Sequence, residues 1–235
     1  MRIRRVVTTR AGGVSASPYD SFNLGDHVGD DPARVATNRR RLAHDLKLSD
    51  DHVVWMEQVH GRTVTVVDGP RTGAAEATDV LVTAEPGVAV AVLTADCVPV
   101  LLADPAAGIV SAVHAGRVGA RIGVVPTALQ AMKDLGARVD RVEVLLGPAV
   151  CGKCYEVPPA MQADVEKHLP GSASKTRSGT SGLDLRAGLW EQLAAIGVAK
   201  IGIDPRCTAE DRSLFSHRRE GTTGRLAALT WVERT

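Results

Sequence analysis

Three side chains in this sequence have the right chemistry to hold a metal ion or to react with a substrate: His60, Cys97 and His114. Each follows an apolar, strand-like run, and a strand end gives a side chain rigid placement next to an opening. Two imidazoles and one thiolate make a three-ligand zinc site, whose fourth position stays open for water or substrate. Zinc in such a site lowers the pKa of its water to ~7 and polarises an oxygen. The bland alternative is a set of buried core residues, because cysteine and histidine in apolar surroundings are often structural.

Residues 88–119 carry two of the three side chains, and the remaining elements must supply the third partner and the walls of a cavity. Apolar runs predict short strands over residues 3–8, 63–67, 79–83, 88–93, 98–103, 109–113, 139–146, 200–203 and 226–232. Residues 53–59 are also apolar and lead directly to His60. The near-continuous apolar character of the central strands indicates sheets that are covered on both faces.

Helical spacing of apolar residues predicts helices over residues 32–47, 126–135, 158–169 and 185–196. Asp31-Pro32 is a favourable start for the first helix, and Gly197 stops the last. Polar stretches over residues 15–29, 171–181 and 215–225 indicate loops. Strands come in runs separated by helices without strict alternation, which predicts an α+β fold. We expect one layered domain over residues 1–235, with mixed β-sheets flanked by helices.

The composition argues against a nucleic-acid-binding or membrane protein. The 235 residues carry 28 basic and 27 acidic side chains, so no global field favours a nucleic-acid or membrane partner. Only 3% of the residues are aromatic, which weighs against stacking platforms for single-stranded nucleic acid. No run reaches the ~18–20 apolar residues of a membrane span, and the charged N-terminus lacks the apolar core of a signal peptide. We therefore expect a cytoplasmic protein whose four cysteines are reduced thiols or metal ligands.

Several motifs occur in a fixed order along nearly the whole chain, from residue 8 to residue 225. They are TTRAGGVS at 8–15, FNLGDHVGDDP at 22–32, QVHG at 58–61, TADCVP at 94–99, VHAG at 113–116, GPAVCGKCYEV at 147–157 and FSHRREGTTGR at 215–225. Together they resemble the laccase-domain, or YfiH-like, family of purine nucleoside phosphorylases.

This resemblance implies that His60, Cys97 and His114 are both the zinc ligands and the catalytic residues. It implies phosphorolysis of adenosine, inosine, guanosine and methylthioadenosine, with adenosine deamination as an added activity. The partners are then a purine nucleoside and phosphate, and we expect a monomer. The implied fold is a layered α+β arrangement related to the catalytic domain of cytotoxic necrotizing factors. Older descriptions call family members polyphenol oxidases, and some bacterial members are linked to the correction of peptidoglycan precursors.

Phosphorolysis also needs an anion site and contacts to the sugar or base. Arg10 and Arg117 are candidates for phosphate, because a guanidinium matches phosphate bidentately, and Asn23 is a candidate for the sugar hydroxyls or the base. The family commonly continues its last metal motif as HAGWRG, whereas this chain has Arg117-Val118 in place of Trp-Arg. The ligands are all present, but this departure bears on substrate preference and rate.

Three other functions stay open. A copper polyphenol oxidase would use the same ligand types, although the seven histidines include no H-x-H pair and are few for a multi-copper enzyme. A cysteine hydrolase would use Cys97 as nucleophile and His114 as base. A binding module in cell-wall quality control would turn over no nucleoside.

The pair Cys151-x-x-Cys154 fits a redox pair or half of a structural zinc site. Cys207 could join it, but the sequence offers no nearby histidine as a fourth ligand. We prefer the interpretation that these are small buried thiols.

Overall fold

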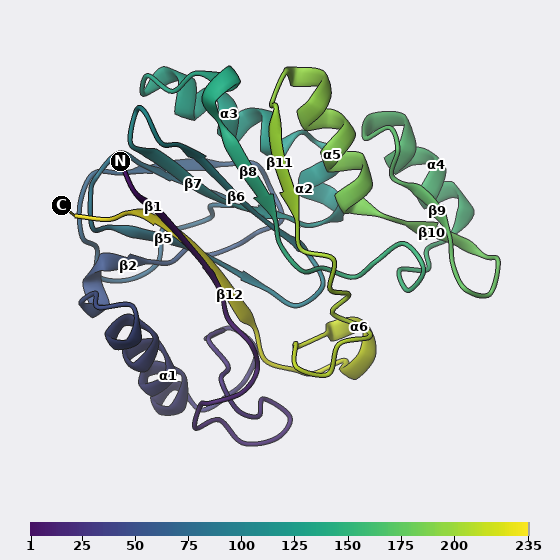
Figure 1. The fold of residues 1–235 in the computed structure, drawn as a ribbon. Coiled ribbons are helices and arrows are strands. Elements are labelled where there is room, and N and C mark those ends of the chain that lie inside the picture. The colour runs from purple at the N-terminus through teal and green to yellow at the C-terminus, as the bar shows by residue number, and fades with distance from the viewer. Residues whose placement is uncertain (235) are drawn as a thin grey trace.

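Two mixed β-sheets pack face to face in the computed structural model, which describes residues 1–234 (Figure 1). The four-stranded sheet has the order β1 (Ile3–Val7), β12 (Leu226–Val232), β5 (Ala89–Thr94) and β2 (Val53–Val54). The six-stranded sheet has the order β11 (Lys200–Ile203), β8 (Glu143–Leu146), β6 (Val98–Asp104), β7 (Ile109–Ala115), β4 (Val80–Thr83) and β3 (Val64–Val67). Each sheet contains parallel and antiparallel pairs, which confirms the α+β class with mixed sheets.

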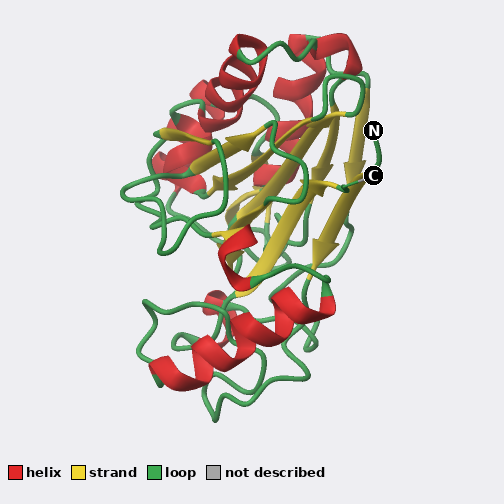
Figure 2. Ribbon diagram, turned by 90° about the vertical axis from the view of Figure 1, so that its left-hand side faces the viewer, coloured by secondary structure: helices red, strands yellow, loops and turns green. Residues whose placement is uncertain are grey.

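Helices cover the outer face of each sheet, so the molecule has four layers (Figures 1 and 2). The long helix α1 (Pro32–Asp45) packs on the four-stranded sheet. The helices on the side of the six-stranded sheet are α2 (Arg117–Arg121), α3 (Val124–Asp134), α4 (Pro159–His168) and α5 (Leu185–Ile196). Short 3-10 turns lie at η1 (Asp50–His52) and η2 (Val139–Arg141). None of the helices described in residues 1–234 is long and apolar enough to cross a membrane.

Alternating side chains on the central strands fill the layers on both sides. In β5, Val90 and Val92 enter the core between the two sheets, whereas Ala89, Ala91 and Leu93 face α1. Because successive residues of a strand point to opposite faces, a strand that is apolar at every position must be buried on both. The expectation of sheets covered on both faces is therefore confirmed.

Local signals set the helix boundaries. The Asp31 carboxylate accepts a hydrogen bond from the N–H of Ala33, and Pro32 opens α1, as the sequence predicted. Gly197 ends α5 with a φ of 100°, a conformation that glycine adopts without a steric penalty.

Two of the expected polar loops contain short elements. Residues 171–181 include β9 (Ala173–Lys175), which pairs with β10 (Ser181–Leu183) as a two-stranded hairpin. Residues 215–225 include α6 (His217–Glu220), whose N-cap Ser216 accepts a hydrogen bond from the N–H of Arg219. Both elements are three or four residues long and polar, so neither has a periodicity that sequence analysis detects.

The chain changes sheets between β5 and β6, and this crossing creates the opening that matters most. β5 belongs to the four-stranded sheet and β6 to the six-stranded sheet. The turn between them, residues 95–97, therefore lies at the end of both sheets. His114 stands near the end of β7, directly opposite Pro99 of β6.

Candidate metal centre and substrate cavity

The structure brings His60, Cys97 and His114 together at this opening. Their ligand atoms all lie within 4.8 Å of one another, and the Cys97 Sγ lies 4.0 Å from the Nε2 of His60. The two imidazole rings meet edge to face, with centroids 4.6 Å apart. In a tetrahedral zinc site with Zn–S of about 2.3 Å and Zn–N of about 2.0 Å, sulfur and nitrogen stand about 3.5 Å apart. The donor types and their spacing therefore fit a zinc-sized ion after small side-chain adjustments.

Gln58 fixes the turn that carries His60. Its side-chain amide donates a hydrogen bond to the Leu93 carbonyl and accepts one from the Leu93 N–H, each 2.8 Å long. The amide thus pairs with the edge of β5 as a neighbouring strand would. Because β5 runs directly into the turn that holds Cys97, this pairing sets the position of His60 relative to the thiol.

Asp79 joins two of the three residues. Its fully buried carboxylate accepts hydrogen bonds from the backbone N–H groups of Val59 (3.3 Å), His60 (3.0 Å) and Gly61 (2.6 Å). The same carboxylate lies 2.8 Å from the Nδ1 of His114. Burial raises the pKa of Asp79, but the hydrogen bonds from His114 and Gly61 outweigh it and hold the pKa below its usual value. The group is therefore a carboxylate, which organises both histidines.

The contact with Asp79 also selects the tautomer of His114. A neutral imidazole that donates from Nδ1 has its lone pair on Nε2, on the side of the other two ligands. His114 is buried, whereas His60 is exposed and Cys97 is half-buried, so the cluster is open on the His60 side. The arrangement suits a site with protein ligands on one side and a free position on the other.

Gly116 leaves the space in which the ligands meet. A Cβ at this position would lie 2.8 Å from the His60 ring and 3.1 Å from the Cys97 Sγ. These distances are shorter than ordinary van der Waals contacts, and Gly116 has an extended φ of −72° that any residue adopts. The glycine is therefore required for space and not for backbone conformation.

Without a metal, the Cys97 thiol and the His114 imidazole each shift the pKa of the other toward the charged form. Burial raises the pKa of Cys97, but hydrogen bonding and positive charge from His114 and His60 outweigh it and lower the pKa to about 6. Burial lowers the pKa of His114, but Asp79 and Cys97 outweigh it and raise the pKa to about 9. The two shifts describe a thiolate–imidazolium pair, and a thiolate is the form of cysteine that binds metals.

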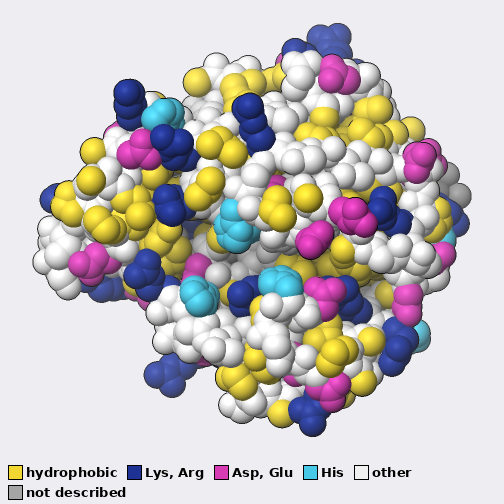
Figure 3. Space-filling model, turned by 180° about the vertical axis from the view of Figure 1, so that it is seen from behind, with side chains coloured by type: hydrophobic (Ala, Val, Ile, Leu, Met, Phe, Trp, Pro, Cys, Tyr) yellow, Lys and Arg dark blue, Asp and Glu magenta, His cyan; other side chains and the backbone are white. Residues whose placement is uncertain are grey.

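A cavity of about 390 Å³ opens beside Cys97. Its polar rim includes Arg117, His217 and Arg218, and its apolar wall includes Val150 and Leu185; Ala95, Asp96 and Tyr155 complete the lining with Cys97. In the view from behind, a furrow crosses the middle of the molecule with histidine and basic side chains at its edges (Figure 3).

Asp96 fixes one wall of this cavity. Its carboxylate accepts hydrogen bonds from the hydroxyls of Thr208 (2.5 Å) and Ser216 (2.7 Å) and from the N–H of Arg218 (2.6 Å). Asp96 has a φ of 94°, which is rare for a residue other than glycine. Strain of this kind persists where surrounding contacts hold it, and here the contacts attach α6 to the residue next to Cys97.

The three residues expected to bind substrate occupy different environments. Arg117, the first residue of α2, lines the cavity beside Cys97. Arg10 instead forms ion pairs with Glu220 (2.7 Å) and Asp20 (3.4 Å) and lies over the Phe215 ring. Asn23 is fully buried, and its amide contacts Gly25, Asp30 and the N–H of Arg225. Of these three residues, only Arg117 lines the cavity.

Sequence reasoning missed several residues that build the site, above all Asp79, Gln58 and Asp96. Asp79 was expected to begin the strand over residues 79–83, and the structure places it directly before β4, whose four residues are all buried. An aspartate next to four buried residues was the available signal. Gln58 and Asp96 lie inside the motifs that carry His60 and Cys97, but their side chains contact backbone groups and hydroxyls that are distant in sequence and that no sequence pattern locates.

Known proteins resemble this chain over nearly its whole length. Residues 4–233 match the family model described as multi-copper polyphenol oxidoreductase laccase. A protein of Mycobacterium tuberculosis named purine nucleoside phosphorylase is 61% identical over 233 residues, which cover 99% of this chain and 93% of that protein. A Corynebacterium glutamicum protein of the same name is 60% identical, with 98% and 94% covered.

Solved structures show the same fold. YlmD from Geobacillus stearothermophilus superposes with a TM-score of 0.93 at 35% identity, covering 99% of this chain and 92% of YlmD. The YfiH protein of Bacillus licheniformis superposes with a TM-score of 0.92 at 30% identity, covering 98% and 93%.

Proposed function

This chain belongs to the laccase-domain, YfiH-like family, as its motifs predicted, and on that premise we propose that it is a zinc-dependent purine nucleoside phosphorylase. The observation that carries the proposal is the meeting of two imidazoles and a thiol at the mouth of a cavity with arginines on its rim. The names of the M. tuberculosis and C. glutamicum relatives support the same reaction class.

His60, Cys97 and His114 would hold the zinc ion. The test of fit is the donor set itself, with the His114 Nε2 freed by Asp79 and space provided by Gly116. When bound, zinc supplies a Lewis acid with an open position that orients and polarises an oxygen ligand. A multi-copper centre is disfavoured, because the two potential metal-ligand clusters in residues 1–234 contain only two histidines.

Arg117 and Arg218 would bind phosphate on the cavity rim. Guanidinium groups pair with phosphate through two parallel N–H donors. One Arg218 nitrogen donates to the Glu156 carbonyl at 3.1 Å, and its guanidinium lies over the Tyr155 ring at 5.1 Å. These contacts hold Arg218 in place while leaving other donors for an anion.

The purine base would pack against the apolar wall of the cavity, which Val150 and Leu185 form. In phosphorolysis a phosphate oxygen forms a bond to C1′ of the sugar, the glycosidic C–N bond breaks, and the electron pair passes to the base nitrogen. That nitrogen then takes a proton. The Nδ1 of His217 lies 2.5 Å from the Gly221 carbonyl, so its Nε2 is the atom that can deliver the proton when the ring is protonated.

Arg10 and Asn23 enter the proposal as positioning residues. Arg10 contacts Glu220 at the end of α6, the helix that begins with His217 and Arg218. Asn23 accepts the N–H of Arg225, just before β12. Both residues would hold the loop that forms the cavity rim without contacting substrate.

The finer parts of the proposal concern range and setting. Adenosine, inosine, guanosine and methylthioadenosine share the purine ring and the glycosidic bond that this site would cleave. Adenosine deamination would use the same open metal position with water in place of phosphate. The enzyme would act as a monomer in the cytoplasm, a reducing compartment in which its four free cysteines would stay reduced.

A cysteine hydrolase is the second candidate, because Cys97, His114 and Asp79 form a nucleophile–base–carboxylate series. Such an enzyme needs no metal. Chelation should therefore leave a hydrolase active and abolish the phosphorylase reaction, with activity restored by added zinc.

The test of the proposed function is chromatography of the zinc-loaded protein with each nucleoside, with and without phosphate. We expect free base only when phosphate is present, and ammonia from adenosine as the sign of deamination. Arg117→Ala should raise the KM for phosphate about tenfold or more, whereas Arg62→Ala, a control arginine outside the cavity lining, should not. A fully metallated protein that releases no base from any nucleoside would contradict the proposal and favour the cell-wall function.

A further inference from the structure

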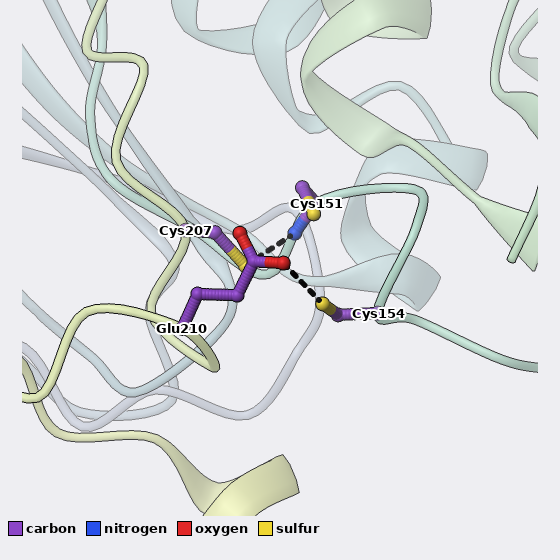
Figure 4. Close-up of side chains that lie close together, drawn as sticks. All are labelled: Cys151, Cys154, Cys207 and Glu210. Atoms are coloured by element: carbon purple, nitrogen blue, oxygen red, sulfur yellow. Dashed lines mark hydrogen bonds between the residues drawn. The ribbon is translucent and has the colours of Figure 1, made fainter. Parts of the chain in front are cut away.

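A second cluster of sulfur and oxygen atoms lies apart from the metal centre. Cys151, Cys154, Cys207 and Glu210 place their ligand atoms within 4.8 Å of one another (Figure 4). Cys151 and Cys154 come from the loop after β8, and Cys207 and Glu210 come from the loop after β11. None of the four lines the cavity beside Cys97.

Each loop presents its two ligands from a single tight turn. The carbonyl of Cys151 accepts hydrogen bonds from the N–H groups of Cys154 and Tyr155, each 2.9 Å long. The carbonyl of Cys207 likewise accepts from the N–H groups of Glu210 (3.1 Å) and Asp211 (2.8 Å). The two turns thus have the same i, i+3 spacing, Cys-x-x-Cys facing Cys-x-x-Glu.

Backbone contacts hold the two turns against each other. Ala149 and Cys207 form a parallel bridge, and the N–H of Thr208 donates to the Ala149 carbonyl at 3.2 Å. The N–H of Cys151 donates to the Cys207 Sγ at 3.3 Å (Figure 4). The approach of the ligands is therefore set by the main chain and does not depend on flexible side chains alone.

We propose that Cys151, Cys154, Cys207 and Glu210 form a structural zinc site that is separate from the His60–Cys97–His114 centre. Three thiolates and a carboxylate would fill all four positions of a tetrahedral zinc ion. Four protein ligands are typical of structural zinc sites, whereas catalytic sites keep one position open. Thiolates disfavour magnesium and calcium, which prefer oxygen ligands. Two thiolates on one zinc ion stand about 3.8 Å apart, so the cluster needs only a small contraction.

Contacts around Glu210 agree with this role. Its Oε1 accepts from the Cys154 Sγ at 3.4 Å and also forms an ion pair with Arg177. A ligating carboxylate commonly has such an outer partner, which orients it toward the metal. Glu210 is exposed and Cys207 is buried, so the metal would enter from the carboxylate side.

The zinc ion would tie together two walls of the substrate cavity. Val150 and Tyr155 flank the Cys-x-x-Cys turn and line the cavity. Thr208, inside the second turn, donates to Asp96, the neighbour of Cys97. Cross-linking the turns would fix these walls, and this role is independent of the reaction that takes place between them.

The experiment uses a Cys97→Ser protein, in which the first centre cannot contribute a thiolate. We expect this variant to retain one zinc ion per chain after dialysis against a weak chelator, measured by elemental analysis. Adding Cys207→Ser should abolish that zinc. Glu210→Gln should weaken zinc binding at least tenfold in a competition titration, whereas the neighbouring control Asp211→Asn should leave it unchanged.

Thiol counting keeps the proposal testable if Cys207→Ser does not fold. In native Cys97→Ser protein, the three remaining thiols should react with a thiol reagent only after a strong chelator is added. Cobalt substitution should give the near-ultraviolet sulfur-to-metal absorption of a thiolate site. A zinc-free Cys97→Ser protein, a disulfide that leaves one reactive thiol after denaturation, or an unchanged zinc affinity in Glu210→Gln would each overturn the four-ligand site.

Discussion

Replacing Asp79 by asparagine should damage the metal centre although Asp79 touches no metal. The carboxylate is fully buried, and its two oxygens accept four hydrogen bonds, three from backbone N–H groups of residues 59–61 and one from His114. The asparagine amide has only one acceptor oxygen. Whichever way it lies, its NH₂ group faces donors that the carboxylate had satisfied.

The two orientations of the amide have different consequences for zinc. If NH₂ faces His114, the imidazole must turn its lone pair toward Nδ1, and Nε2 then carries the proton and cannot bind metal. If NH₂ faces Gly61, the turn that presents His60 loses its anchor. Loss of an outer partner of this kind typically lowers metal affinity 10- to 100-fold, and we expect Asp79→Asn to do so.

Stability should fall as well. Each oxygen of Asp79 accepts two hydrogen bonds, and a hydrogen bond to a charged group contributes about 1.5–3 kcal/mol. Loss of the two bonds at one oxygen should therefore lower the free energy of unfolding of the metal-free protein by roughly 3 kcal/mol or more. Chemical denaturation followed by circular dichroism measures this change.

Asp104→Asn is a matched control. Asp104 is also fully buried at an end of a strand and accepts backbone N–H bonds from Ala106, Ala107 and Arg138, but it lies at the opposite end of β6 from Cys97. It should lose comparable stability and keep the zinc affinity of the unmodified chain. An Asp79→Asn protein with unaltered zinc affinity in a chelator competition would refute the reasoning.

Three further predictions follow from the same contacts. Gly116→Ala should lower zinc affinity at least tenfold by displacing the ligands, whereas Gly69→Ala, whose added Cβ meets nothing within 4 Å, should not; zinc titration compares them. In metal-free protein, alkylation of Cys97 should be fast above its pKa of about 6 and slow about tenfold per pH unit below it, and zinc should protect the thiol; equal rates at pH 5 and 8 would contradict the lowered pKa. Burial raises the pKa of Glu220, but hydrogen bonds from a threonine and two arginines lower it to about 2, so its stabilising effect should be present above pH 4.5 and be lost as the pH falls toward 2. Acid unfolding of Glu220→Gln should show a shallower decline of stability over that range.

Periodicity predicted most of the regular elements. Most strands of the two sheets and the four longer helices lie near their expected positions, because each buries an apolar face or both faces. The strand expected over residues 139–146 begins only at Glu143, because Val139–Arg141 form the 3-10 turn η2. The end of α1 came two residues early, at Asp45, where Leu46 caps the helix and Lys47 turns to a φ of 59°. The β9–β10 hairpin, α6, α2 and β2 were missed, because each is only two to five residues long and too short for a periodic pattern.

The site was less accessible to sequence reasoning from physics alone. His60, Cys97 and His114 are separated by 37 and 17 positions, and no local spacing joins them. Only the ordered motifs of the family linked the three residues. The prediction that Asn23 contacts substrate stays untested. In the structure its buried amide accepts a hydrogen bond from the N–H of Arg225, so this motif residue holds the loop before β12 in place.

In the cluster around Cys207, too few types of ligand were expected from the sequence. The Cys-x-x-Cys pair is evident in the sequence, but a histidine was expected as the fourth ligand. Glu210 follows Cys207 by three positions, and a carboxylate in that position completes the set. The parallel bridge between Ala149 and Cys207, which brings the turns together, connects residues 58 positions apart and has no sequence signature.

The most direct test of the central claim is the identity of the sugar product. The zinc-loaded protein is mixed with inosine and phosphate, and ribose 1-phosphate is measured by phosphorus NMR alongside free hypoxanthine. We predict equal amounts of the two products, and neither product with Cys97→Ser. Release of hypoxanthine with free ribose, or equal turnover by Cys97→Ser, would contradict a phosphorylase built on His60, Cys97 and His114.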